Sequence, residues 1–260
     1  MDEKKIKKTY KEEKKELKEK YRSERHSLRQ RLYSALDGIS LLRKGRTPIN
    51  PPKRSLLEEV GNSVSHLVGA VLSVVALVLM CIESDTAADY VGGAIYAFGL
   101  IVMFTMSCLY HAFPHGGKVK RLFQRFDYSS IYLLIGATFA PILLSYVGGT
   151  FGIVFLIIQW AVIATGITLI SVFGPSRVKP LHITLYVVLG WCGLLILPLM
   201  VKRGDISFML MILGGGVIYS LGTIPFALKG RVAHFIWHFF VLGGAIVQWI
   251  GIYNTVFLSR

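Results

Sequence analysis

The sequence predicts an all-α membrane protein with seven transmembrane helices, on three observations. Of its 260 residues, 53% are hydrophobic and only 17% are charged. Most of the charge lies at one end, because residues 1–55 hold 18 of the 29 Lys and Arg residues. The rest of the chain divides into apolar stretches of about 20 residues, the length at which a helix crosses a bilayer.

The predicted domains are a basic tail over residues 1–54 and a membrane domain over residues 55–260. Residues 2–35 are rich in Glu and Lys at helical spacings, which predicts a polar helix. Its sparse apolar side chains recur every eleven residues, at Ile6, Leu17 and Leu28. This stripe suits a solvated or membrane-surface helix, which we favour, or self-association through the helix. The tail carries no nucleic-acid-binding motif, so we expect no nucleic-acid partner.

Seven apolar stretches after the tail are the predicted membrane spans. They cover roughly residues 61–82, 90–112, 127–147, 152–173, 182–201, 207–228 and 234–258. Lys and Arg in the loops predict the orientation, because both are enriched on the cytoplasmic side. With loops on alternating sides, 26 of the 29 Lys and Arg residues fall on the side of the tail. We expect a multi-pass protein of the cell membrane, with a cytoplasmic N-terminus and the C-terminus outside.

Polar side chains gather at the predicted cytoplasmic ends of several spans. His234 and His238 lie in the first turns of the seventh span, four residues apart and therefore on one helix face. Ser107 and His111 lie in the last turns of the second span, and Asp127 opens the third. Ionisable groups are costly inside a membrane, so their gathering at one depth indicates a functional site.

The residue types in this layer indicate a zinc site. Neutral imidazole is a good zinc ligand, and catalytic zinc keeps three protein ligands and a water. Three imidazoles would come from His111, His234 and His238. Zinc lowers the pKa of its water towards 7, and Asp127 could accept the proton. Ser107, one turn before His111, could donate a hydrogen bond to a developing oxyanion.

The first span adds a polar face whose role the sequence leaves open. Glu59, Asn62 and His66 follow one another at close to one helical turn. His66 is either a further metal ligand, a group behind the ligands, or a side chain that only hydrogen-bonds between helices. Asp127 also has a second interpretation, in which it pairs with Arg125 or caps the third span.

Together these motifs resemble the hemolysin III family. The resemblance covers about residues 55–258 and rests on Glu59-x-x-Asn62-x-x-x-His66, Ser107-x-x-x-His111, Asp127 within Arg125-Phe126-Asp127-Tyr128, and His234-x-x-x-His238. That family is grouped with the progestin and adipoQ receptors and is distantly similar to the alkaline ceramidases. The resemblance implies zinc near the cytoplasmic face, held by His111, His234 and His238, with Asp127 and Ser107 beside it. Through the ceramidases it also implies hydrolysis of a lipid amide.

Three functional hypotheses follow. The first is a zinc-dependent membrane hydrolase of a lipid amide or ester bond, in which zinc hydroxide attacks the carbonyl. The second is a membrane sensor or lipid-homeostasis protein with structural zinc. The third, suggested by the family name, is a cytolytic or channel-like protein, although nothing in the residues supports lysis directly. The sequence shows no extracellular ligand-binding extension, so we do not expect a protein-hormone partner.

Overall fold

A computed structural model describes residues 3–37, 49–228 and 232–259. Apart from the turns that join the helices, these residues are helical, and none of them forms a strand. The chain forms two units, residues 1–48 and residues 49–260. Six residues of the charge count that predicts the orientation lie outside the described residues: Arg43, Lys44, Arg46, Lys229, Arg231 and Arg260.

The first unit contains one helix, α1 (Glu3–Asp37), as the Glu and Lys spacing predicts. Leu17 and Leu28 of the eleven-residue stripe are exposed along it, while the side chain of Ile6 lies outside the described part. Self-association through this helix and its cytoplasmic position stay predictions.

The second unit is a bundle of helices, and seven of the described helices are long and apolar enough to cross a membrane, which confirms the fold class. Its elements are α3 (Leu56–Ile82), α4 (Ala87–Ala112), α5 (Lys118–Pro141), η1 (Ile142–Val147), α6 (Gly149–Phe173), α7 (Lys179–Trp191), η2 (Cys192–Ile196), α8 (Leu197–Arg203), α9 (Ile206–Ala227), α10 (Ala233–Ile252) and η3 (Tyr253–Leu258). The short η elements continue their neighbours, so α5 with η1, α7 through α8, and α10 with η3 each make one span.

The helix ends follow from their local sequence. Ser55 caps α3 by accepting a hydrogen bond from the backbone of Glu58, and Thr86 forms a capping box with Asp89 at the start of α4. Pro141 ends the regular part of α5, where η1 takes over as a π-helix, because proline removes a backbone donor from the helix. The third span differs from its prediction, since its helix already begins at Lys118.

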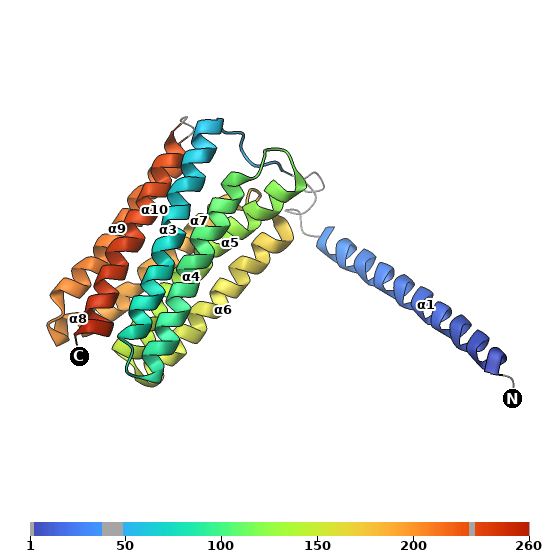
Figure 1. The fold of residues 1–260 in the computed structure, drawn as a ribbon, viewed down its shortest axis with the longest axis horizontal. Helices are drawn as coiled ribbons and strands as arrows, with labels where there is room; N and C mark the ends of the chain where they lie inside the picture. The colour runs from blue at the N-terminus through green and yellow to red at the C-terminus, as the bar shows by residue number, and fades with distance from the viewer. Residues whose placement is uncertain (1–2, 38–48, 229–231, 260) are drawn as a thin grey trace. The chain divides into compact units, whose positions relative to one another are not determined.

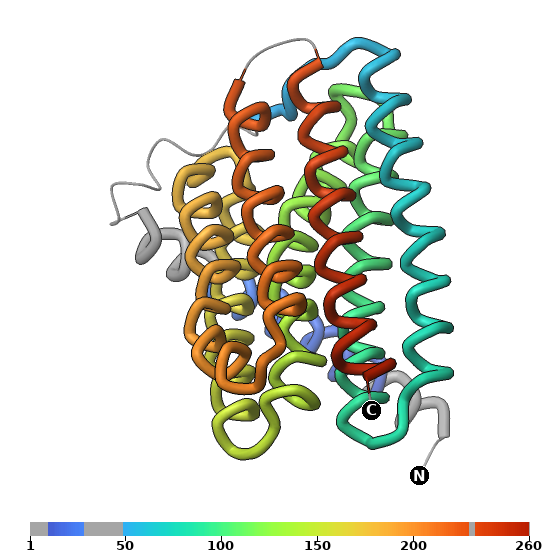
Figure 2. The backbone as a smooth tube through the Cα atoms, turned by 90° about the vertical axis from the view of Figure 1, so that its left-hand side faces the viewer, coloured from blue at the N-terminus to red at the C-terminus, as the bar shows by residue number. Residues whose placement is uncertain are grey.

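Contacts between neighbouring helices hold the bundle together. Helix α4 packs along both α3 and α5, and α10 packs along both α9 and α3 (Figures 1 and 2). At Gly99 a Cβ would lie 2.3 Å from the Cβ of Ala137, so only glycine allows α4 and α5 this close together. The last turns of α4 are thereby held against the first turns of α5. We call the end of the bundle where α3, α5, α7 and α10 begin, and α4 ends, the histidine end.

Candidate metal centre

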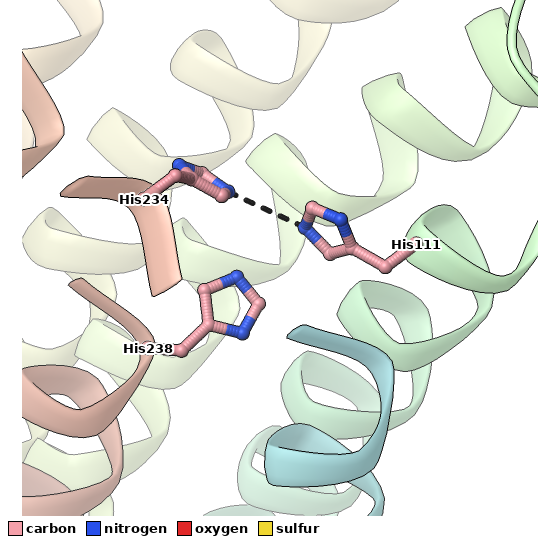
Figure 3. Close-up of side chains that lie close together, drawn as sticks. All are labelled: His111, His234 and His238. Carbon is pink, nitrogen blue, oxygen red and sulfur yellow. Dashed lines mark hydrogen bonds between the residues drawn. The ribbon is translucent and has the colours of Figure 1, made fainter. Parts of the chain in front are cut away.

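Three histidines meet at the histidine end. His111 comes from the last turn of α4, and His234 and His238 come from the first two turns of α10 (Figure 3). One ring nitrogen of each lies within 4.8 Å of the others, so the group could hold a metal ion. His111 and His238 are buried and His234 is half-buried. The structure therefore brings together the three histidines that the sequence predicts as ligands.

The spacing of one pair of these rings suits a metal such as zinc. Two nitrogens at about 2.0–2.1 Å from a tetrahedral zinc would lie about 3.3–3.4 Å apart. The Nε2 atoms of His111 and His234 are 3.3 Å apart. Nδ1 of His111 lies 2.6 Å from the Glu59 carboxylate, and Nδ1 of His238 lies 3.1 Å from the Asn62 carbonyl. With Nδ1–H donated to these oxygens, Nε2 of both rings keeps its lone pair for a metal, the usual support for a histidine ligand.

The polar face of α3 lies directly behind these ligands. Glu59 accepts from Nζ of Lys120 at 3.0 Å with its second oxygen, and Nδ2 of Asn62 is 3.4 Å from Nδ1 of His111. Both side chains therefore contact the ring of His111 on the side away from His234. In the described part of the chain, this α3 face supplies carboxylate and amide contacts that fix the orientation of one imidazole.

His66 is placed differently from the other residues of that face. Its ring stacks on His238 with 3.8 Å between centroids, and Phe104 packs edge-on against it at 5.1 Å. Both of its ring nitrogens are buried, with no hydrogen-bond partner among the described residues. Gly69 makes room for this arrangement, because a Cβ there would lie 2.4 Å from the ring of Phe104. His66 is outside the group of three and supports His238 by ring contact.

Asp127 lies in the third turn of α5, one helix away from His111. The cap of α5 is Gly117, so the interpretation of Asp127 as a helix cap is wrong. Arg125 points elsewhere and donates to the carbonyl of Ser171 at 2.8 Å. The hydroxyl of Ser107, which is buried on α4, lies near the Asp127 carboxylate. The two residues predicted to act beside the metal are therefore close to each other.

Two cations at this end were counted from the sequence only as loop charges. Lys120 is fully buried, and its Nζ lies 4.5 Å from the centre of the Tyr110 ring as well as against Glu59. Nε of Arg54 lies 3.4 Å from the carboxylate of Glu58, whose side chain is 9% exposed. Glu58, the residue before Glu59, is therefore paired by Arg54. The spacing of seven residues between Lys120 and Asp127, two helical turns, is the signal that could have placed this lysine.

A further buried histidine stands apart from the group. His182 on α7 is 0% exposed, and its Nδ1 lies 2.9 Å from the hydroxyl of Tyr132. It is bound to α5 rather than to the three histidines. Burial alone therefore does not identify the candidate metal ligands at this end. The three candidates are identified by the closeness of their ring nitrogens.

An apolar cavity lies between α5, α7, α9 and α10, and Phe226 in its wall has its ring centre 5.8 Å from that of His234. Trp237 and Val241 line it on α10, on either side of His238 in the sequence, and Ile131 and Phe226 line it from α5 and α9. Its walls are mostly aliphatic and aromatic, as in sites for apolar ligands. The polar group of the histidine end thus adjoins a space suited to a hydrocarbon chain.

Comparison with known proteins agrees with the motifs. A family model described as haemolysin-III related matches residues 54–249. The chain is 35% identical to a hemolysin-3 homolog of Bacillus subtilis over 74% of its length and 91% of the relative. It is 26% identical to the human monocyte to macrophage differentiation factor over 82% of its length and 91% of that relative. The adiponectin receptor protein of Drosophila melanogaster is 25% identical over 81% of this chain and 55% of its own length. The chain belongs to the haemolysin III family, within the superfamily of the progestin and adipoQ receptors.

Proposed function

We propose that this protein is a zinc-dependent hydrolase that cleaves an amide or ester bond of a membrane lipid. The observation that carries the proposal is the convergence of His111, His234 and His238 next to the Ser107–Asp127 pair. If each histidine only formed its own hydrogen bond between helices, the three ring nitrogens would have no reason to lie close together. Catalytic zinc needs such a set, with one coordination position left for water.

The three histidines would hold the ion, and Glu59 would fix the ring of His111 through its Nδ1. When bound, zinc supplies Lewis acidity and lowers the pKa of water towards neutrality. The Asn62 carbonyl plays the same orienting part for His238. Because these contacts come from α3 while the ligands come from α4 and α10, the site depends on three helices being packed together.

Asp127 is the proposed general base and Ser107 its partner. The carboxylate of Asp127 takes a proton from the attacking water and later delivers it to the leaving amine or alcohol. A serine hydroxyl has a single proton to donate. While Asp127 is ionised, that proton goes to its carboxylate; once Asp127 is protonated, Ser107 is free to donate to the oxyanion of the tetrahedral intermediate.

The surroundings support a lipid substrate. The seven membrane-spanning helices place the site within reach of bilayer lipids, and the cavity lined by Trp237 and Val241 gives an acyl chain an apolar wall beside His238. The distribution of Lys and Arg favours a cytoplasmic histidine end in the cell membrane, with the basic tail, residues 1–54, on the same side.

Metal content is the first test. Mass spectrometry of the detergent-purified protein should find about one zinc per chain, and His238→Ala should lose it. Asp127→Asn should keep zinc but lose hydrolysis of a lipid amide or ester by roughly 10²–10⁴-fold, the usual contribution of a general base. If both proteins lack metal, the polar side chains at the histidine end only form hydrogen bonds between helices. If Asp127→Asn hydrolyses the lipid at the wild-type rate, Asp127 is not the general base.

His66 favours a second candidate, a membrane sensor or lipid-homeostasis protein with structural zinc. Its buried nitrogens lack partners in the described structure and its ring lies against His238, so a rotated His66 would supply a fourth nitrogen. Structural zinc is closed by four protein ligands. X-ray absorption of the zinc-loaded protein separates the candidates: four imidazoles, with one lost in His66→Ala, would identify structural zinc, and three imidazoles plus oxygen the hydrolase.

A further inference from the structure

The segment that leads into α3 carries an arginine at the histidine end. Residues 49–55 precede the helix; within them Pro51 is buried, and the side chain of Asn50 accepts from Nη1 of Arg121 on α5 at 2.9 Å. Arg54 follows, with its side chain 12% exposed. These contacts fasten the segment to the histidine end and hold the guanidinium among the helices that form the site.

Every carboxylate around this guanidinium already has a partner. Glu58 receives Nε of Arg54 at 3.4 Å, Glu59 binds Lys120 and His111, and Asp127 lies near the Ser107 hydroxyl. The Tyr110 hydroxyl also lies near Arg54. One nitrogen of Arg54, Nη1, is nevertheless buried with no hydrogen-bond partner in the described chain. A guanidinium has five donors in a planar fork, so donors of Arg54 are left for a ligand.

The charges at this end leave room for an anion. Three cations belong to the charged cluster around the histidines: Arg54, Lys120 and Lys179. Three carboxylates belong to it as well: Glu58, Glu59 and Asp127. These six side chains are balanced in formal charge before a metal enters, and Arg121 and Arg125 of the same end bond to Asn50 and Ser171 instead. A divalent cation on the three histidines would leave an excess of positive charge, which an anionic ligand would offset.

Contacts between side chains connect these cations to the histidines. Glu59 bonds to both Lys120 and His111, and the ring of Phe226 contacts both Lys179 and His234. Arg54 pairs with Glu58, the residue before Glu59. It stands directly before Ser55, the cap of α3, at the boundary of the membrane span. Lipid phosphates lie at this boundary, while the ester or amide bonds lie deeper, where the histidines are. A phosphate on Arg54 would thus place the scissile bond towards the metal centre.

We propose that Arg54 binds the phosphate of the substrate lipid, so that the substrate of the proposed hydrolase is a phosphate-bearing lipid rather than a neutral one. The inference rests on the proposed function and names its substrate class. Arginine suits this role because its fork matches two phosphate oxygens at once. The hydrocarbon chain of the same lipid occupies the cavity beside Trp237 and Val241, and the bond between chain and head lies across the histidines.

The test measures binding rather than turnover. The zinc-loaded full chain in detergent is titrated with an ether-linked phosphatidic acid and with the dialkylglycerol of identical chains, and bound lipid is counted by native mass spectrometry. Ether lipids have no bond for the enzyme to hydrolyse. We expect at least about tenfold tighter binding of the phosphate lipid, equivalent to about 1.4 kcal/mol. Equal binding of the two lipids by the wild type would overturn the proposal without any variant.

Variants assign the effect to Arg54. Arg54→Gln should remove the preference for phosphatidic acid and leave dialkylglycerol binding unchanged, while Arg54→Lys, which keeps the charge but loses the fork, should retain only part of it. Arg125→Gln is the matched control, because Arg125 is an exposed cation on α5 that bonds to Ser171 instead. Zinc content and the unfolding midpoint of each variant show whether it is folded. Full preference in folded Arg54→Gln would contradict the assignment.

Two further ligands identify the chemistry that is recognised. Equal, Arg54-dependent binding of palmitate would mean that a carboxylate is the ligand and would overturn the phosphate assignment. Displacement of phosphatidic acid by inorganic phosphate at equal concentration would mean that free phosphate is bound, and would overturn the lipid assignment. The hydrolase proposal is contradicted by a different result. If the protein binds the phosphate lipid through Arg54 but hydrolyses no lipid, the Arg54 site is supported and the hydrolase proposal is wrong.

Discussion

The two ends of the bundle satisfy buried polar groups in different ways. At the end opposite the histidines, Thr86 and Asp89 form a capping box within one turn. Tyr146 donates to Asp205 at 2.6 Å, and Arg203 lies over the same tyrosine ring and donates to its carbonyl. The capping box closes the start of α4, and the other two contacts join η1 to the last residue of α8 and to the turn before α9, across 57 and 59 residues of the sequence. The contacts of Tyr146 hold neighbouring spans together.

At the histidine end the long-range contacts converge on the three histidines. Glu59 and His111 are 52 residues apart, Asn62 and His238 are 176 apart, and His111 and His234 are 123 apart. None of these contacts caps a helix or closes a turn. Ionisable groups cost free energy inside a membrane and usually mark a functional site. The comparison therefore supports a structural role for the polar groups at one end and a functional role for those at the histidine end.

The largest effect should come from removing one ligand. His111→Ala should weaken zinc binding by about a hundredfold or more, because even indirect support of a metal ligand contributes 10–100-fold. His182→Ala is the control: it removes a histidine that is equally buried at the same end but bonded to Tyr132. Zinc per chain after dialysis is the readout. Zinc that survives His111→Ala, or is lost from His182→Ala, would break the distinction between the group and its neighbour.

A smaller effect should follow from loss of the carboxylate behind His111. Glu59→Gln should weaken zinc binding by about 10–100-fold, or about 1.4–2.7 kcal/mol, because Glu59 fixes the Nδ1 proton of that ring. Glu58→Gln is matched in sequence and side chain, and Glu58 pairs with Arg54 instead. Competition with a fluorescent zinc chelator measures both affinities. Equal losses in the two variants would show a general effect of charge at this end.

Packing beneath the site should affect stability by a comparable or smaller amount. In Gly69→Ala the new methyl would meet the ring of Phe104, which holds His66, and overpacking costs typically about 1–3 kcal/mol. Gly190→Ala on α7 is the control, since nothing lies within 4 Å of its Cβ position. Unfolding in mixed detergent micelles measures the difference. If Gly69→Ala were as stable as Gly190→Ala, α3 and α4 would have room to adjust.

The smallest effect should be at the opposite end. Tyr146→Phe removes the hydrogen bond to Asp205 and should lower stability by roughly 0.6–1 kcal/mol, as for interhelical hydrogen bonds in membranes, with zinc binding unchanged. Tyr253→Phe at the same end, where the ring stacks on Trp249, controls for the loss of a hydroxyl. A change in zinc affinity in Tyr146→Phe would mean that the two ends are coupled.

The seven spans were predictable from hydropathy because a bilayer imposes the length and apolar character of each helix. The boundary of the third span was not, since Lys118 to Arg125 look like a loop in sequence. In the structure Lys120 is buried in α5 by its pairing with Glu59 on α3. A charged residue that is paired with a residue of another helix can therefore be buried in a helix, although the hydropathy of its own segment predicts a loop.

The sequence by itself determined the seven helices, the depth of the histidines and the pairing of residue types that suits zinc. These depend on periodicity and hydropathy, which are local. Only the tertiary structure decided that Glu59 contacts His111, that His66 stacks on His238, and that Arg54 pairs with Glu58. The physical reason is that hydropathy places a residue along the membrane normal, whereas rotation and neighbours in the membrane plane are set by helix packing.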